Sequence, residues 1–119
     1  PVVLSRYQEG YHWHHDSLPE GWMLKVVKPG RYRLRFTDSK KYPFSLDDFW
    51  KQHSQAKAVI KWKDNIHHEL LKPGASFVDV SLTGGDGRLD VYFEVEKNGK
   101  IEKNWNSDIS VEYLPNENL

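Results

Sequence analysis

Hydrophobic and polar residues alternate over short stretches of this sequence, and glycine or proline separates most of these stretches from one another. Such alternation is typical of β-strands with one buried face, because successive side chains on a strand point to opposite sides. The clearest case is 31–36, where three large apolar side chains alternate with three arginines. A similar stretch, 22–27, precedes it. The intervening Lys28-Pro29-Gly30 predicts a turn, so the two stretches are expected to form an antiparallel hairpin.

Further stretches alternate in the same way. Those predicted to be strands are 2–4, 57–63, 66–71, 77–82, 89–95 and 109–113. Asp64-Asn65 predicts a hairpin turn, Asn98-Gly99 predicts a type I′ turn, and the glycine-rich stretch 84–87 predicts a tight loop. The segment 45–52 breaks the alternation, because its apolar residues are three and four apart. With Ser45 as N-cap and two aspartates in the first turn, it predicts a short helix.

These elements predict an all-β fold: an antiparallel β-sandwich of about eight strands with one short helix near 45–52. The expected organisation is a single domain over residues 1–114, followed by a frayed tail at 115–119. The predicted core consists of Trp22, Leu24, Val26, Tyr32, Leu34, Phe36, Ile60, Val78, Val80, Leu89, Val91, Phe93, Ile109 and Val111.

Composition narrows the classes of function. The 119 residues include 17 basic and 17 acidic side chains, so no overall charge attracts nucleic acid or an anionic membrane. The absence of cysteine excludes disulfides, thiol nucleophiles and cysteine-based metal sites. No apolar run approaches the roughly 18–20 residues that a membrane span needs, so no membrane insertion is expected. The chain begins at Pro1 and its one methionine is Met23, which favours an excised piece of a larger protein.

Six histidines are present, and His12 and His14 are the candidates for a metal site. Two residues that are two apart on a strand share a face, so both imidazoles could bind one ion together with a third ligand. The alternative is that they are polar positions in an irregular N-terminal segment. The alternative is favoured, so no metal or other cofactor is expected in this chain.

No catalytic residues are predicted. Asp90, Glu94 and Glu96 share one strand face, but general acid–base chemistry needs two carboxyl groups in contrasting environments, and an exposed face offers only one. The sequence has no Gly-x-Ser-x-Gly motif, and the glycine-rich stretch 84–87 lacks the Lys-Ser/Thr and the helix of a phosphate-binding loop.

Basic and aromatic side chains predict a binding surface instead. Arginine binds sulfate or carboxylate with two hydrogen bonds, and exposed rings stack on sugars, so an anionic glycan is a suitable ligand. The candidate ligand-binding residues are Trp13, Arg31, Arg33, Arg35, Trp50 and Trp105, and Tyr92 is expected to be exposed on the polar face of its strand. The alternative, which is favoured, is a solvated strand face whose arginines pair with acidic residues across the sheet.

The segment 21–36, with Gly21-Trp22 and Pro29-Gly30, resembles a strand pair in the C-terminal region of bacterial arylsulfatase-like proteins. The segments 56–62, 72–82, 87–100 and 109–114 resemble later parts of that region in the same order. The resemblance implies a galactose-binding-like sandwich that serves as an accessory domain. The chain departs from the family pattern at 35–38, where Arg-Phe-Thr-Asp replaces the usual Arg-Arg-Trp-Pro.

That resemblance implies a partner, the N-terminal catalytic domain of the same protein, which would hold calcium and act on a sulfated substrate in the periplasm or outside the cell. The Cys/Ser-x-Pro-x-Arg motif of the sulfatase nucleophile does not occur in this chain, which is therefore expected not to be an enzyme by itself. The predicted function is a non-catalytic accessory domain that supports the catalytic domain and contributes to substrate binding. The alternatives are a free-standing carbohydrate-binding module and a metal-dependent enzyme built on His12 and His14.

Overall fold

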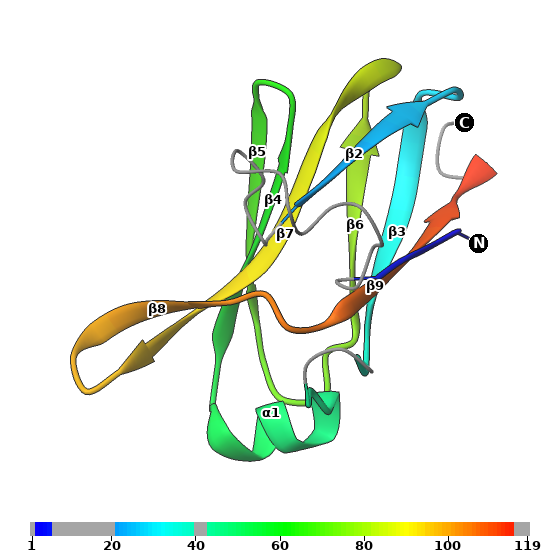
Figure 1. Cartoon of the computed structure of the whole chain (residues 1–119). Coiled ribbons are helices and arrows are strands. Elements are labelled where there is room, and N and C mark those ends of the chain that lie inside the picture. The colour runs from blue at the N-terminus through cyan, green and yellow to red at the C-terminus, as the bar shows by residue number, and fades with distance from the viewer. Residues whose placement is uncertain (1, 6–20, 40–42, 116–119) are drawn as a thin grey trace.

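The computed structural model describes residues 2–5, 21–39 and 43–115, and within them it contains nine strands in two antiparallel sheets and one short helix. This confirms the predicted all-β antiparallel sandwich (Figure 1). The elements are β1 (Val2–Leu4), β2 (Gly21–Val26), β3 (Gly30–Thr37), α1 (Leu46–Gln52), β4 (Ala56–Trp62), β5 (Asn65–Leu71), β6 (Phe77–Leu82), β7 (Gly85–Lys97), β8 (Lys100–Asn104) and β9 (Asp108–Tyr113).

One sheet has the strand order β1-β9-β3-β6, and the other has the order β2-β7-β4-β5. The long strand β7 continues past the body of the second sheet and pairs there with β8, so that this hairpin projects from the sandwich (Figure 1). The helix α1 lies across one end of the two layers, between β3 and β4 in the chain (Figure 1).

The core fills the space between the sheets, and every predicted core residue is either buried there or packed against it. Leu34 and Ile109 from one sheet and Leu89, Val91 and Phe93 from the other have no exposed surface. Burial of side chains of this size stabilises a fold by about 1.5–3 kcal/mol each. Alternation along the sequence therefore identifies the interior correctly, because one face of each sheet is hidden from water.

The predicted hairpin over 22–36 is wrong. β2 pairs with β7, with Trp22 opposite Leu89, whereas β3 pairs with β6 and β9. The Lys28-Pro29-Gly30 connection therefore carries the chain from one sheet to the other instead of reversing it within a sheet. The alternation indicates which side of a strand is buried but not which strand lies beside it. A hairpin turn within one sheet and a connection between two sheets use the same turn residues, so the turn does not tell them apart.

The glycine-rich stretch 84–87 is also not a loop throughout, because β7 begins at Gly85 and pairs with the end of β2. A side chain at Gly87 would bring its Cβ within 3.1 Å of the Trp62 ring, so glycine allows the backbone to approach that ring closely. The turn between β4 and β5 lies at Lys63 and Asp64, one residue earlier than predicted.

Two local predictions are confirmed. Asn98 and Gly99 connect β7 and β8 with φ values of 53° and 77°, as a type I′ turn requires. Ser45 is the N-cap of α1, and its Oγ accepts a hydrogen bond from the amide of Asp48 at 3.3 Å. The helix turns Phe49 into the core, where its ring stacks on Phe93 at a centroid distance of 4.6 Å.

Candidate functional site

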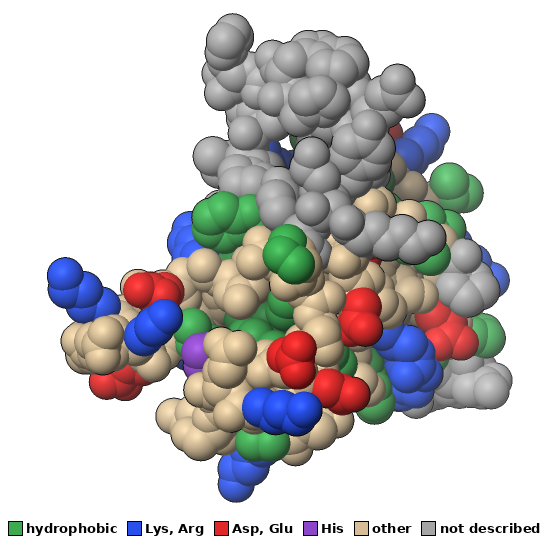
Figure 2. All heavy atoms as spheres, turned by 60° about the horizontal axis from the view of Figure 1, so that its bottom comes forward, with side chains coloured by type: hydrophobic (Ala, Val, Ile, Leu, Met, Phe, Trp, Pro, Cys, Tyr) green, Lys and Arg blue, Asp and Glu red, His purple; other side chains and the backbone are tan. Residues whose placement is uncertain are grey.

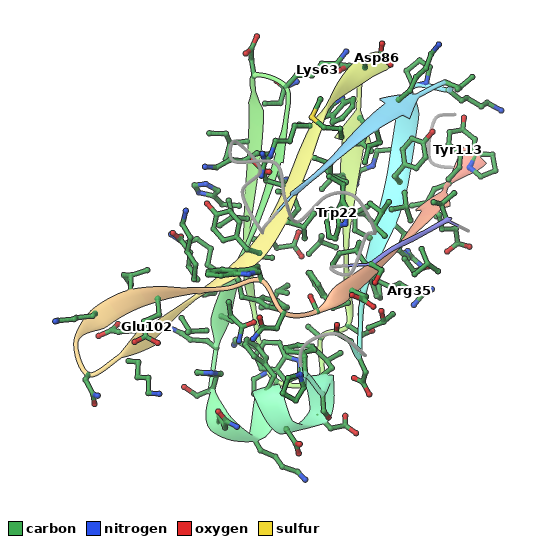
Figure 3. All side chains as sticks on the ribbon, viewed as in Figure 1. Trp22, Arg35, Lys63, Asp86, Glu102 and Tyr113 are labelled. Atoms are coloured by element: carbon green, nitrogen blue, oxygen red, sulfur yellow. The ribbon has the colours of Figure 1, made fainter. Side chains whose placement is uncertain are left out.

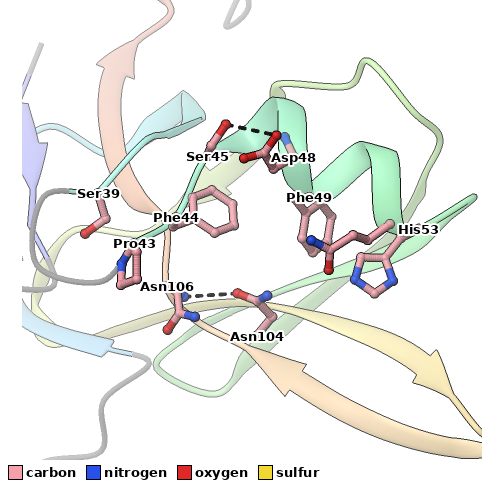
Figure 4. Close-up of a pocket in the computed structure, with 10 residues that line it drawn as sticks. Ser39, Pro43, Phe44, Ser45, Asp48, Phe49, His53, Asn104 and Asn106 are labelled. Carbon is pink, nitrogen blue, oxygen red and sulfur yellow. Dashed lines mark hydrogen bonds between the residues drawn. The ribbon is translucent and has the colours of Figure 1, made fainter.

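A polar pocket of about 520 Å³ lies beside α1, between the helix and the segment that joins β8 to β9 (Figure 4). Hydrogen-bonding side chains dominate its lining, which is the pattern of a site for a polar ligand. These side chains belong to Ser39, Ser45, Asp48, Gln52, His53, Asn104 and Asn106.

Backbone contacts hold the two walls of the pocket in place. On the helix side, the amide of Leu46 donates to the Asp38 carboxylate at 2.9 Å, and Ser39 and Phe44 form an isolated β-bridge. On the other side, the amide of Asn106 donates to Asn104 Oδ1 at 3.1 Å. Each wall is thus fixed by its own short-range hydrogen bonds before any ligand binds.

Aromatic rings form the floor. Phe44 and Phe49 are buried, and their ring centroids are 5.9 Å apart. The imidazole of His53 lies 4.7 Å from the Phe49 ring, so the histidine is supported on one side and open to the pocket on the other (Figure 4). Asp48 stands at the rim, mostly exposed, with its carboxylate 3.7 Å from the Lys51 ammonium.

A second hollow of about 710 Å³ adjoins the first, because Gln52 and His53 line both. Its far wall belongs to the projecting β7–β8 hairpin, with Glu94, Glu96 and Ile101 among its residues. Figure 2 turns this end of the molecule forward and shows acidic and basic side chains interspersed over it. The two hollows together could accommodate an elongated ligand that extends from α1 toward the hairpin.

The donor and acceptor set determines what the pocket can bind. Asparagine and glutamine amides both donate and accept, serine hydroxyls do the same, and an aspartate accepts only. Within the part of the chain that the structure describes, no hydrogen bond engages the side-chain amides of Gln52 and Asn106, which leaves them available to a ligand. Such a set matches the many hydroxyl groups of a sugar better than it matches a strongly charged group.

The two predicted tryptophans of this region differ in environment. Trp105 is half-buried and lies in the sequence between Asn104 and Asn106, but unlike these two residues it does not line the pocket. Trp50 is on α1, but its ring packs against the core and its indole nitrogen donates to the carbonyl of Ala75 at 2.8 Å. Because its polar atom and its ring already have partners, Trp50 supports the helix.

The predicted arginines lie elsewhere, on the face of β3 opposite to the buried Leu34 and Phe36. Figure 3 labels Arg35 among them. Arg33 binds Asp79 with two hydrogen bonds of 2.8 and 3.0 Å, and Arg35 is 3.9 Å from Glu112. Arg31 donates to the Ser81 hydroxyl at 3.3 Å. Arg33 and Arg35 thus pair with acidic residues across the sheet, as the alternative interpretation expects, whereas Arg31 contacts a hydroxyl group.

The arginines also set the ionisation of their neighbour. The hydrogen bond from Arg33 lowers the pKa of Asp79, and the charges of Arg33, Arg31 and Arg35 add to this effect, while burial opposes it. On the opposite, inner face of β3, burial, together with the nearby Tyr113, raises the pKa of Tyr32. Both groups lie on strands of the four-stranded sheet, and neither lines the pocket.

Tyr92 is not the exposed ring that the sequence predicts. It is 4% exposed, with the ammonium groups of Lys61 and Lys103 lying 5.6 and 4.8 Å from its ring centroid. The prediction fails because a residue on the outer face of a sheet can still be covered by the long side chains around it. Trp13, His12 and His14 lie outside the described residues.

Sequence reasoning missed Gln52, His53, Asn104 and Asn106. These residues come from two segments about fifty positions apart, and nothing in either segment predicts that the fold joins them. The one available signal was the sequence Asn-Trp-Asn at 104–106, which places two amides beside an aromatic ring.

No protein-family model, no curated protein and no solved structure matches this chain. Among the residues that the structure covers, no group of three or more histidine, aspartate or glutamate side chains is arranged to hold a metal ion. In the same residues, no helix is long and apolar enough to cross a membrane.

Proposed function

We propose that this chain is a non-catalytic accessory domain of a sulfatase-like hydrolase that acts on a sulfated carbohydrate. The sequence patterns shared with arylsulfatase-like proteins support this proposal, since they follow the same order over most of the chain. The all-β sandwich agrees with it, because such a domain stabilises and extends a catalytic partner without supplying reactive groups. The partner would be the N-terminal catalytic domain of the same protein, with its calcium, in the periplasm or outside the cell.

The pocket beside α1 is the observation on which a binding role depends. Its amides, hydroxyls and carboxylate surround a floor of buried rings, and a second hollow continues from it. Sugars present hydroxyl groups around their edge and apolar C–H groups on their face, so this combination of polar walls and ring floor suits them. We therefore assign to the pocket an uncharged portion of the carbohydrate chain.

The sulfate groups of the substrate are expected to bind elsewhere. Arg33 and Arg35 already have carboxylate partners, and a sulfate would have to displace these to gain a bidentate contact. The pocket itself contributes the carboxylate of Asp48, which repels sulfate. Accordingly, the isolated chain should bind desulfated and sulfated forms of its oligosaccharide with similar affinity.

Calorimetric titration of the isolated chain with matched sulfated and desulfated oligosaccharides tests this proposal. Asn106→Ala removes an amide from the pocket wall and should weaken binding at least about tenfold, or 1.4 kcal/mol. Asn65→Ala removes an exposed amide from β5, which does not line the pocket, and should leave affinity unchanged. Equal binding by wild type and Asn106→Ala, or binding that requires sulfate and is lost in Arg31→Gln, would contradict the assignment of the pocket.

A free-standing carbohydrate-binding module is the second candidate, and it is favoured by the fact that this chain alone forms both hollows. The two candidates differ in what is encoded next to the domain. A sulfatase domain encoded upstream of Pro1, together with faster turnover of the oligosaccharide when both parts are joined, would support the accessory role. Micromolar binding by a chain with no such neighbour would support the free-standing module.

A further inference from the structure

Strand β5 lies at an edge of its sheet, and within the described residues it pairs only with β4. Trp62 and Asn65 face each other across the two-residue turn, which makes them a hydrogen-bonded pair. Because such pairs alternate with non-bonded ones, the N–H and C=O groups of Ile66, His68 and Leu70 point away from β4. The outer edge of β5 therefore offers three sets of backbone groups to another strand.

This edge also lacks the lysine and proline residues that commonly prevent strand pairing. Residues 65–71 contain no lysine, proline or glycine, whereas the edge strand β2 has Lys25 and β8 has Lys100 and Lys103. Ile66 and Leu70 are 60% and 59% exposed on the outer face of the strand. Exposed apolar side chains beside unpaired backbone groups favour the addition of a strand.

We propose that a second copy of this chain pairs here, with the two β5 strands antiparallel and centred on His68. In this register each Ile66 lies opposite the Leu70 of the other copy, and the two His68 residues face each other. All three residues with outward-pointing backbone groups then meet their counterparts in hydrogen-bonded pairs. The interface is isologous, since the same strand serves both copies. This inference does not depend on the proposed function.

The polar residues on the inner face of β5 favour the same register. His67 and Glu69 share the inner face of the strand, where the imidazole and the carboxylate are 3.1 Å apart. Centring the pair on His68 places each His67 opposite the Glu69 of the other copy. Centring it on residue 69 instead would place the two Glu69 carboxylates directly opposite each other, which is unfavourable. Centring it on residue 67 would leave Glu69 opposite Asn65 and would lose the pairing of imidazole with carboxylate across the interface.

Sedimentation velocity over a range of protein concentrations tests the proposal with the full chain. Wild type should dimerise as concentration rises, and His68→Lys should stay monomeric because it places two ammonium groups opposite each other. Ile101→Lys is the matched control, since Ile101 is a comparably exposed isoleucine on the edge strand β8, and it should dimerise like wild type. A monomeric wild type throughout, or a His68→Lys variant that still dimerises, would overturn the proposal.

The absence of cysteine from the sequence permits a second measurement that does not rely on charge repulsion. In a hydrogen-bonded antiparallel pair the Cα atoms are about 5.5 Å apart, within the range of about 4.4–6.8 Å that a disulfide allows. Under mild oxidation His68→Cys should form a covalent dimer several times faster than Ile101→Cys. Equal rates for the two variants would show that β5 does not meet its copy at His68.

Discussion

At the level of single residues, Arg33 makes two kinds of contact. Its guanidinium makes the bidentate pair with Asp79 and also lies 4.1 Å from the centre of the Phe77 ring. Both members of the ion pair are about one quarter exposed, so water screens them less than it screens the neighbouring Arg35–Glu112 pair, which is 44% exposed on each side. The two ion pairs on this sheet face carry the same charges but are expected to contribute unequally to the free energy of unfolding.

We expect Asp79→Asn to lower the free energy of unfolding by about 1 kcal/mol at neutral pH. Because the pKa of Asp79 is lowered in the folded chain, its contribution is present above the ordinary aspartate pKa of about 3.9. It is lost as the pH falls through the lower pKa of the folded state. Urea titrations of wild type and Asp79→Asn should therefore give different free energies of unfolding at pH 7 and similar ones at about pH 2.

Glu112→Gln is the control, since it removes a carboxylate from the more exposed pair on the same face. Its effect on the free energy of unfolding should stay within about 0.5 kcal/mol. A difference between wild type and Asp79→Asn that persists unchanged at about pH 2 would mean that packing, and not ionisation, explains the loss.

At the level of elements, the Asn98-Gly99 turn requires a left-handed backbone conformation at both of its residues. Gly99 has a φ of 77°, and nothing lies within 4 Å of the position that a Cβ would occupy. Gly99→Ala therefore meets no steric obstacle from its neighbours, and its cost of about 1 kcal/mol should come from the left-handed backbone alone. The urea midpoint of unfolding measures it.

Asn98→Gly serves as the comparison for this turn, because glycine accepts the φ of 53° found at that position. We expect its stability to stay within a few tenths of a kcal/mol of wild type. A Gly99→Ala variant as stable as Asn98→Gly would show that the β7–β8 hairpin adjusts its turn and does not require a positive φ there.

The same elements show how far the sequence predicts the fold. The eight predicted strands, the helix with its Ser45 cap and the predicted core residues follow from local patterns and are confirmed. Strand β8 was not predicted, and β7 begins earlier than predicted, inside the stretch 84–87. The neighbours of β2 and of β3 in their sheets do not follow from the sequence, because a turn within a sheet and a connection between sheets use the same residues. The pocket also does not follow, since its walls meet only when β8 is brought against the end of α1.

At the level of the whole molecule, Phe93 lies where the two sheets and the helix α1 meet. Its ring lies between the sheets, 4.5 Å from the ring centroid of Phe36 and 4.6 Å from that of Phe49, so it joins both layers to α1. We expect Phe93→Ala to lower the free energy of unfolding by about 3–5 kcal/mol, as large cavities in a core do. Thermal and urea unfolding should both report this loss.

Phe77→Ala removes the same ring from an exposed position, and its cost should be well below that of Phe93→Ala. Because Phe49 forms the floor of the pocket, Phe93→Ala should also weaken ligand binding below the temperature at which the chain unfolds. Equal effects of the two substitutions would contradict the central position assigned to Phe93.

The crossing between β2 and β3 determines when the chain can fold during its synthesis. The pairing partner of β2 is 85–90, and the partners of β3 are 77–82 and 108–113. All of these residues are synthesised later, so neither strand has its neighbour when it leaves the ribosome. Such distant pairings slow folding, because a large loop must close before the contacts form. Until β9 emerges, the apolar faces of the early strands remain open to chaperones and to other nascent chains.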